Sequence, residues 1–86
     1  MDKPYRLQVF TQEKKVLDES VTSIVVPGAE GYFGILADHA PLTASLGQGT
    51  LTVISGSGER KYTISGGFLE VVQNQATILA DSLVAA

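Results

Sequence analysis

The chain has 86 residues, with six Lys and Arg against nine Asp and Glu, a net charge of −3 and no cysteine. The acidic balance argues against a nucleic-acid binder, which normally carries a basic stripe, and the lack of cysteine excludes a disulfide scaffold, a zinc finger and a cysteine nucleophile. A chain that is 44% hydrophobic and 17% charged is expected to fold as a single globular domain, residues 1–86, burying about 63% of its unfolded surface.

Hydrophobic and polar residues alternate with a period of two along much of the chain, which is typical of strands with one buried face. The first such run is residues 5–9, and a polar turn at residues 12–15 leads to a short return strand from Val16. Residues 20–26 are rich in β-branched side chains and predict a further strand. Pro27-Gly28 then forms a strong stop signal.

The middle and end of the chain are divided by glycine and proline. We interpret residues 28–34 as a tight loop that leads into a short strand, and residues 38–41 as a turn. Gly66-Gly67 indicates a bulge or a close backbone approach. The tail, residues 81–86, is a candidate helix start that is too short to stand alone. The remaining expected strands are residues 33–36, 42–46, 50–55, 60–64, 68–72 and 75–80.

This gives eight to ten short strands, turn signals about every eight residues and no clear amphipathic helix. Such spacing predicts an all-β fold, either a β-sandwich or a flattened barrel. No apolar run exceeds four residues, so no segment is expected to span a bilayer, and the N-terminus lacks the apolar stretch of a secretory signal. The simplest expectation is a soluble cytosolic domain.

Residues that carry catalytic chemistry are scarce. His39 is the only histidine and directly follows Asp38, but adjacent residues rarely form a catalytic pair. None of the serines lies in a nucleophile-elbow motif, and one histidine without cysteine is a poor metal-ligand set. The pattern Gly28-x-x-Gly31-x-x-Gly34 lacks the Lys-Ser/Thr pair of a phosphate loop. We therefore expect no catalytic residues, metal or cofactor.

The charge distribution allows two interpretations. No basic residue lies between Lys15 and Arg60, a stretch that contains five acidic residues. The favoured interpretation is that these acids occupy ordinary solvated turns. The alternative is that the glycine-rich loop presents Glu30, beside Tyr32 and Phe33, to a polar or basic protein partner. Phe33 is expected in the core and Tyr32 at the surface.

Three separated motifs carry a family resemblance. Residues 27–36, PGAEGYFGIL, are followed by HAPL at 39–42, by ISGGFLEV at 64–71 and by ILAD at 78–81. In order and spacing they resemble the epsilon subunit of F-type ATP synthase, over about residues 5–81. The resemblance implies a ten-stranded, two-sheet β-sandwich.

The same resemblance implies a non-catalytic rotor subunit in the central stalk of a proton-translocating ATP synthase, which couples rotation of the c ring to the gamma subunit. By this likeness Glu30, Gly31 and Tyr32 contact the c ring. The segment His39, Ala40, Pro41 and Leu42 faces gamma. The complex is expected at the cytoplasmic face of a bacterial inner membrane, or alternatively at the stromal face of a thylakoid, without direct membrane insertion of this chain.

The sequence departs from the family pattern at several places. Tyr32 stands where many members carry a second acid, and Ala37-Asp38 replaces a frequent proline-containing form. Typical members continue into a C-terminal two-helix hairpin, in which some bind ATP through an Ile/Leu-Asp-x-x-Arg-Ala motif. This sequence ends at Ala86 without that motif, so we expect no ATP binding by this polypeptide.

The main rival from another functional class is a stand-alone β-sandwich binding module that recognises carbohydrate or protein. A carbohydrate-binding face would be expected to display several coplanar aromatic side chains, yet the chain has no Trp and only three Tyr and three Phe. An enzyme is disfavoured because no set of acid, base and nucleophile is evident.

Overall fold

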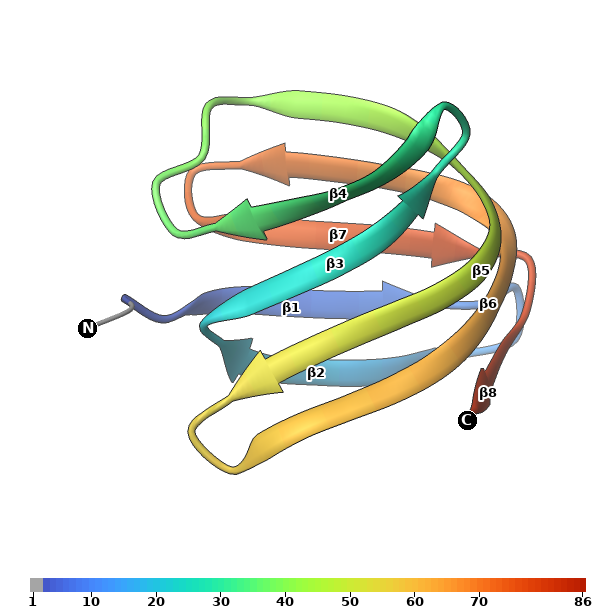
Figure 1. Ribbon diagram of the computed structural model, residues 1–86, viewed down its shortest axis with the longest axis horizontal. Helices are drawn as coiled ribbons and strands as arrows, with labels where there is room; N and C mark the ends of the chain where they lie inside the picture. The colour runs from blue at the N-terminus through green and yellow to red at the C-terminus, as the bar shows by residue number, and fades with distance from the viewer. Residues whose placement is uncertain (1–2) are drawn as a thin grey trace.

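The computed structural model describes residues 3–86, and within this range the regular structure consists of eight strands and no helix (Figure 1). The all-β prediction is therefore confirmed. In chain order the strands are β1 (Tyr5–Phe10), β2 (Lys15–Val21), β3 (Ser23–Gly28), β4 (Gly31–Leu36), β5 (Leu42–Ser55), β6 (Gly58–Val72), β7 (Gln75–Ala80) and β8 (Leu83–Ala85).

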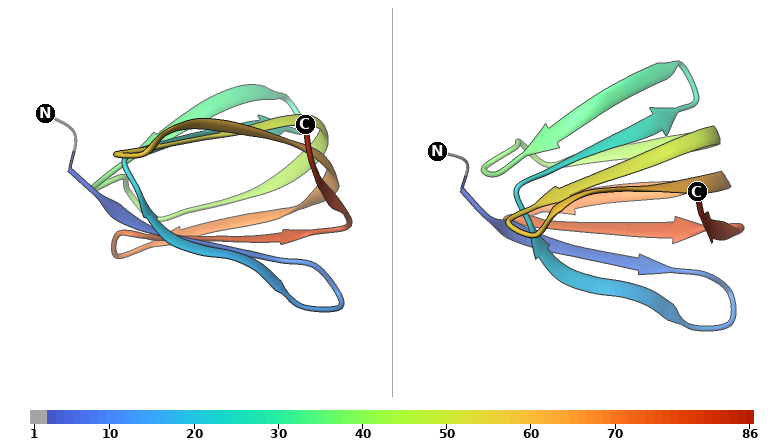
Figure 2. Two further views of the ribbon diagram at one scale, coloured as in Figure 1. Left: turned by 90° about the horizontal axis from the view of Figure 1, so that it is seen from below. Right: turned by 60° about the horizontal axis from the view of Figure 1, so that its bottom comes forward.

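The strands form two packed layers that share their two longest members. The hydrogen-bonded order is β2-β1-β7-β6-β5-β3-β4, with β8 pairing to β6; neighbours are antiparallel except β1 and β7. Strands β5 and β6 curve from one layer into the other (Figures 1 and 2). One layer holds β2, β1, β7, the end of β6 and the start of β5, and the other layer holds the rest. If β5 and β6 are each counted once in each layer, the sandwich has the predicted ten strands.

The curve in β5 and β6 occurs at glycines. Their ladder passes from Leu46↔Gly67 to Gln48↔Ser65, so the register is unchanged and only the pair Gly47 and Gly66 is left out of the ladder. Gly66 and Gly67 have φ angles of +69° and +135°, which favour glycine. A Cβ on Gly67 would also lie only 2.9 Å from the Cα of Ala80. Of the two interpretations of Gly66-Gly67, the close backbone approach is confirmed, whereas the register between the strands does not shift as a bulge would require. The expected strand breaks there and at residues 47–49 are wrong.

Alternate residues of both layers point into one hydrophobic core. The largest fully buried side chains come from six strands: Leu7, Ile24, Ile35, Leu51, Ile64, Leu69 and Ile78. Tyr5 lies at the margin of this core, and its hydroxyl donates a hydrogen bond of 2.7 Å to the carbonyl of Ile35. Burial raises the pKa of Tyr5 to about 12. This bond joins β1 in one layer to β4 in the other.

An ion pair provides a second link between the layers. The Arg60 guanidinium on β6 donates to the carboxylate of Glu19 on β2 and, at 3.3 Å, to the hydroxyl of Tyr62. Glu19 is paired in register with the fully buried Leu7, so its side chain lies on the inner face of its strand. The pair therefore connects β2 with the first half of β6, which belongs to the opposite layer.

Three further sequence expectations are corrected by the structure. The segment 20–26 is not one strand, because the chain changes layer at Thr22, between β2 and β3. Strand β3 continues through Pro27-Gly28, so the expected stop is wrong, and the expected loop at 28–34 is only a two-residue turn. The tail forms β8 on the edge of β6 rather than the start of a helix.

Candidate functional site

A surface groove lies where the two layers end on the same side of the molecule. Strand β4 is the last strand of one layer, and the first half of β5 is the last strand of the other. The groove between them encloses about 740 Å³. It is lined by the β3–β4 hairpin, one residue of the β4–β5 connection and the start of β5: Gly28, Ala29, Glu30, Gly31, Tyr32, Phe33, His39, Leu42, Thr43, Ala44 and Ser45.

The β3–β4 hairpin forms the first wall of the groove. Gly28 pairs with Gly31 and leaves Ala29 and Glu30 at the tip. A side chain at Gly28 is excluded, since a Cβ there would lie 2.6 Å from the carbonyl oxygen of Gly31 and 2.7 Å from the Phe33 ring. Gly31 has a φ of +138°, a conformation that favours glycine. The Ala29 amide donates to the carbonyl of Ser45 at 2.9 Å, which ties the tip to β5.

Glu30 is exposed at this tip. None of the ion pairs found among residues 3–86 involves it. Its carboxylate is therefore available to a donor from outside the described chain. An exposed acid without an internal cation steers a positively charged partner more effectively than a paired one.

Tyr32 and Phe33 are neighbours on β4 and point to opposite faces. Phe33 is half-buried and packs against the hydrophobic core, as predicted. Tyr32 is 59% exposed, which confirms the prediction that it lies at the surface. Its hydroxyl is nevertheless engaged, because it accepts a hydrogen bond of 2.9 Å from the backbone amide of Thr50 on β5.

The β4–β5 connection is held by Asn74 of the β6–β7 turn and by Lys3. Asp38 has a left-handed backbone with φ of 63°, which aspartate tolerates better than most residues. Its amide donates to the Asn74 side-chain oxygen at 2.5 Å, and the Asn74 side-chain nitrogen donates to the Asp38 carboxylate at 2.9 Å. Lys3 lies 3.2 Å from the same carboxylate. The Asn74 hydrogen bond and then Lys3 hold the pKa of Asp38 below its usual range.

The structure brings together five of the seven predicted contact residues. Glu30, Gly31, Tyr32, His39 and Leu42 all line the groove. The ring of His39 is exposed, and its Nδ1 lies 2.8 Å from the carbonyl oxygen of Ala40. Ala40 and Pro41 are exposed beside the groove but do not line it.

The sequence did not indicate that the start of β5 forms the second wall of the groove, nor which residues fix the hairpin and the β4–β5 connection. Thr43, Ala44 and Ser45 were expected only as part of a strand, and Thr50 and Asn74 were given no role. The wall follows from the register, because Gly28 pairs with Leu46 after a break in the β3–β5 ladder. A signal for Asn74 was present, since it lies between the expected strands 68–72 and 75–80, and asparagine is common where a turn needs the positive φ that Asn74 has.

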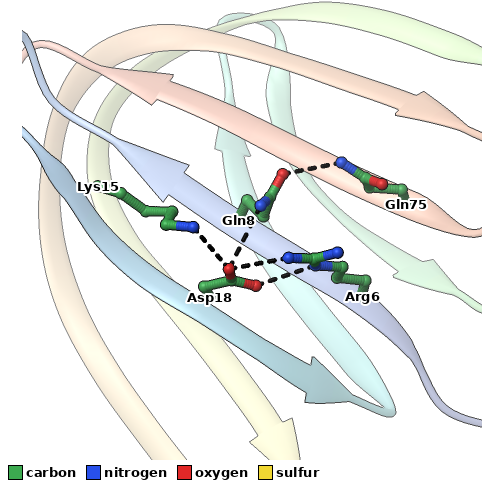
Figure 3. A network of polar contacts seen from close by, with 5 residues as sticks. All are labelled: Arg6, Gln8, Lys15, Asp18 and Gln75. Carbon is green, nitrogen blue, oxygen red and sulfur yellow. Dashed lines mark hydrogen bonds and ion pairs between the residues drawn. The ribbon is translucent and has the colours of Figure 1, made fainter.

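Most basic side chains are paired away from the groove. Asp18 on β2 accepts hydrogen bonds from Arg6, Lys15 and Gln8, and Gln75 donates to Gln8 (Figure 3). Arg6 and Lys15 hold the pKa of Asp18 well below its usual range. This network lies at the β2 edge of its layer, opposite the β5 edge that borders the groove. Among the residues that line the groove, the exposed Tyr32 is of a type enriched at protein contacts, and Glu30 and His39 add a carboxylate and an imidazole.

Comparisons with known proteins place the chain in a family. The sequence model described as "ATP synthase, Delta/Epsilon chain, beta-sandwich domain" matches residues 4–86. The chain belongs to this family. Two similar relatives are both named ATP synthase epsilon chain. The one from Solibacter usitatus is 47% identical over 75 residues, 87% of this chain, and the one from Protochlamydia amoebophila is 48% identical over 80 residues, 92% of this chain.

The chain spans 56% and 54% of the length of these two epsilon chains. Its fold also matches a chain of the Euglena gracilis mitochondrial ATP synthase, solved as an OSCP/F1/c-ring assembly, with a TM-score of 0.90 and 28% identity over 99% of this chain and 60% of that one. A chain from the Tetrahymena thermophila mitochondrial ATP synthase central stalk and c ring has a TM-score of 0.80 at 18% identity and shows the shared fold alone. Across residues 3–86, no helix has the length and apolar character needed to cross a membrane.

Proposed function

We propose that this chain is the β-sandwich part of an ATP synthase epsilon subunit, which couples rotation of the c ring to the gamma subunit and so to ATP synthesis. The observation that carries the proposal is the family match, which extends over residues 4–86 and includes every groove residue. The relatives' names and the Euglena assembly, which contains a c ring, support the same assignment.

Within this role two segments at the groove have separate partners. Glu30, Gly31 and Tyr32, on the projecting hairpin, contact the c ring. His39, Ala40 and Pro41 on the β4–β5 connection, together with Leu42 at the start of β5, contact gamma. The arrangement supports this division because the hairpin tip is exposed and the connection is fixed to a different turn.

The proposed role of the subunit is mechanical, and the subunit catalyses no reaction itself. A close-packed sandwich has low compressibility, and β5 and β6 belong to both layers, so a load on one layer reaches the other through continuous backbone. The chain works as one domain, residues 1–86, bound peripherally at the cytoplasmic face of a bacterial inner membrane.

The c-ring assignment is tested by Glu30→Ala in the complete ATP synthase reconstituted into membranes. We expect proton-driven ATP synthesis to fall severalfold while the enzyme assembles normally. Glu13→Ala is the matched control, since Glu13 is also an exposed turn glutamate that is outside the described ion pairs but lies at the β1–β2 turn. Equal synthesis rates for the two variants would remove Glu30 from the contact.

The gamma assignment is tested by co-purification of the chain with gamma. The wild-type chain is expected to form a stable complex, and Leu42→Ala combined with His39→Ala is expected to weaken it. A stand-alone binding module requires no such complex, so failure of the wild-type chain to retain gamma would favour that alternative.

A further inference from the structure

The β3–β5 ladder is interrupted beside the hairpin. Regular pairing ends at Val25↔Thr52 and resumes only at Gly28↔Leu46, so two residues of β3 face five of β5. One of the two is Pro27, which has no N–H to donate. Backbone groups of β5 in this interval therefore lack regular partners on β3.

The Tyr32 hydroxyl occupies this interruption. Tyr32 is paired with Pro27 on the neighbouring strand, and its side chain passes that proline to reach the Thr50 amide at 2.9 Å. The hydroxyl thus satisfies a main-chain donor that β3 leaves unpaired. It is a side-chain link between the hairpin strand β4 and the second half of β5, two strands that do not pair with each other.

Gly49 provides the space for this link. A Cβ on Gly49 would overlap the Tyr32 hydroxyl and would lie 2.8 Å from the Cβ of Pro27. The backbone of Gly49 is not in the left-handed region, so its conformation does not require glycine. Glycine is needed there because no room is left for a side chain. Tyr32, Pro27, Gly49 and Thr50 therefore form one packed unit.

We propose that Tyr32 is a positioning residue, whose hydroxyl fixes the β3–β4 hairpin against β5 and thereby sets the direction in which Glu30 faces the c ring. The inference rests on the proposed function for its partner. It assigns the Tyr32 hydroxyl an action through Glu30, in addition to the contact with the ring proposed for the Tyr32 side chain. The hairpin is otherwise attached to β5 at its tip by the Ala29–Ser45 hydrogen bond.

The first test needs only the 86-residue chain in solution. Tyr32→Phe keeps the ring and removes the hydroxyl, so hydrogen exchange at the Thr50 amide is expected to accelerate about three- to tenfold, with increased backbone mobility at residues 29–31. Gly49→Ala is expected to do the same with Tyr32 intact, because the added methyl displaces the hydroxyl. Tyr62→Phe is the control, since it removes a hydroxyl bonded to Arg60 elsewhere. Unchanged Thr50 exchange in Tyr32→Phe overturns the proposal.

The second test separates positioning from direct contact by a double-mutant cycle. The affinity of the chain for purified c ring is measured with Tyr32→Phe alone, Glu30→Ala alone and both together. Tyr32→Phe is expected to weaken binding about three- to tenfold on its own and to have no further effect when Glu30 is already alanine. An equal loss in both backgrounds overturns the positioning role. A wild-type chain that fails to bind the ring contradicts the proposed function, whereas Thr50 exchange still decides whether Tyr32 holds the hairpin.

Discussion

Two segments at the groove, the β3–β4 hairpin and the β4–β5 connection, are built by different means. The β3–β4 hairpin depends on missing side chains, because Gly28, Gly31 and Gly49 sit where a Cβ is sterically excluded or conformationally disfavoured. The β4–β5 connection depends on side chains that are present, since Asp38 and Asn74 bond to each other reciprocally. The hairpin therefore needs close packing in addition to its hydrogen bonds at Ala29 and Tyr32, whereas the connection depends on polar contacts between side chains.

This difference predicts different sensitivities. The strand that forms the hairpin wall, β4, is anchored by the neutral hydroxyl of Tyr5, so acid leaves that anchor intact. The connection includes an ionised carboxylate bonded to Lys3 and Asn74, so acid removes its charge. Added volume should destabilise the β3–β4 hairpin, and a change in pH should distinguish the anchor of the hairpin from that of the β4–β5 connection.

The largest effect is expected from added volume in the hairpin. Gly28→Ala forces a methyl group against the Gly31 carbonyl and the Phe33 ring, and overpacking of this kind costs about 1–3 kcal/mol of unfolding free energy. Urea unfolding measures the loss. Gly47→Ala is the control, because the nearest atom to its added Cβ is 4.0 Å away. Equal stability of the two variants would mean that the hairpin is not limited by packing.

An intermediate effect is expected at alkaline pH. The folded pKa of Tyr5 is raised to about 12 from an ordinary value of 10.0, so its contribution is complete below pH 10 and is lost as the pH rises through 12. The loss should reach about 1–2 kcal/mol once solvent screening is allowed for. The measurement is the pH dependence of unfolding free energy in the wild type minus that in Tyr5→Phe. Parallel curves above pH 10 would contradict this origin.

The smallest effect is expected at the connection in acid. The folded pKa of Asp38 is lowered, so its charge stabilises the fold above the ordinary aspartate value of 3.8, and this contribution is lost as the pH falls through the folded pKa. Asp38→Asn keeps a residue that tolerates positive φ. Its unfolding midpoint should lie slightly below that of the wild type at pH 7 and should converge with it in acid. Glu13→Gln, outside the described ion pairs, is the control, and a constant difference at all pH values would argue against the charge.

Much of the fold was predictable from local pattern. The hydrophobic and polar pattern of the sequence predicted β1 and β7 at nearly their observed positions. The continuity of β5 and β6 was not predictable in this way, because Gly47 and Gly66 look like turn residues in sequence and act as bend residues only when both strands curve together. The division of residues 20–26 at Thr22 was likewise not predictable, because it depends on β2 and β3 joining different layers.

The site was predictable in part, and mainly from the family motifs. Those motifs pointed to Glu30 and His39, which the fold places on one groove. The partnership of Tyr32 with Thr50 depends on an irregular register, which no local pattern reports. The same holds for the bonds between Asp38 and Asn74, residues 36 positions apart.

The passage of β5 and β6 through both layers has a mechanical consequence. Two sheets that met only through side chains would be able to slide along their shared interface under a tangential force. Here such sliding would require the backbone to stretch at the corner near Leu46 and Gly67, where the ladder between the strands continues. The domain therefore resists sliding of one layer over the other through the covalent backbone of β5 and β6 as well as through side-chain packing.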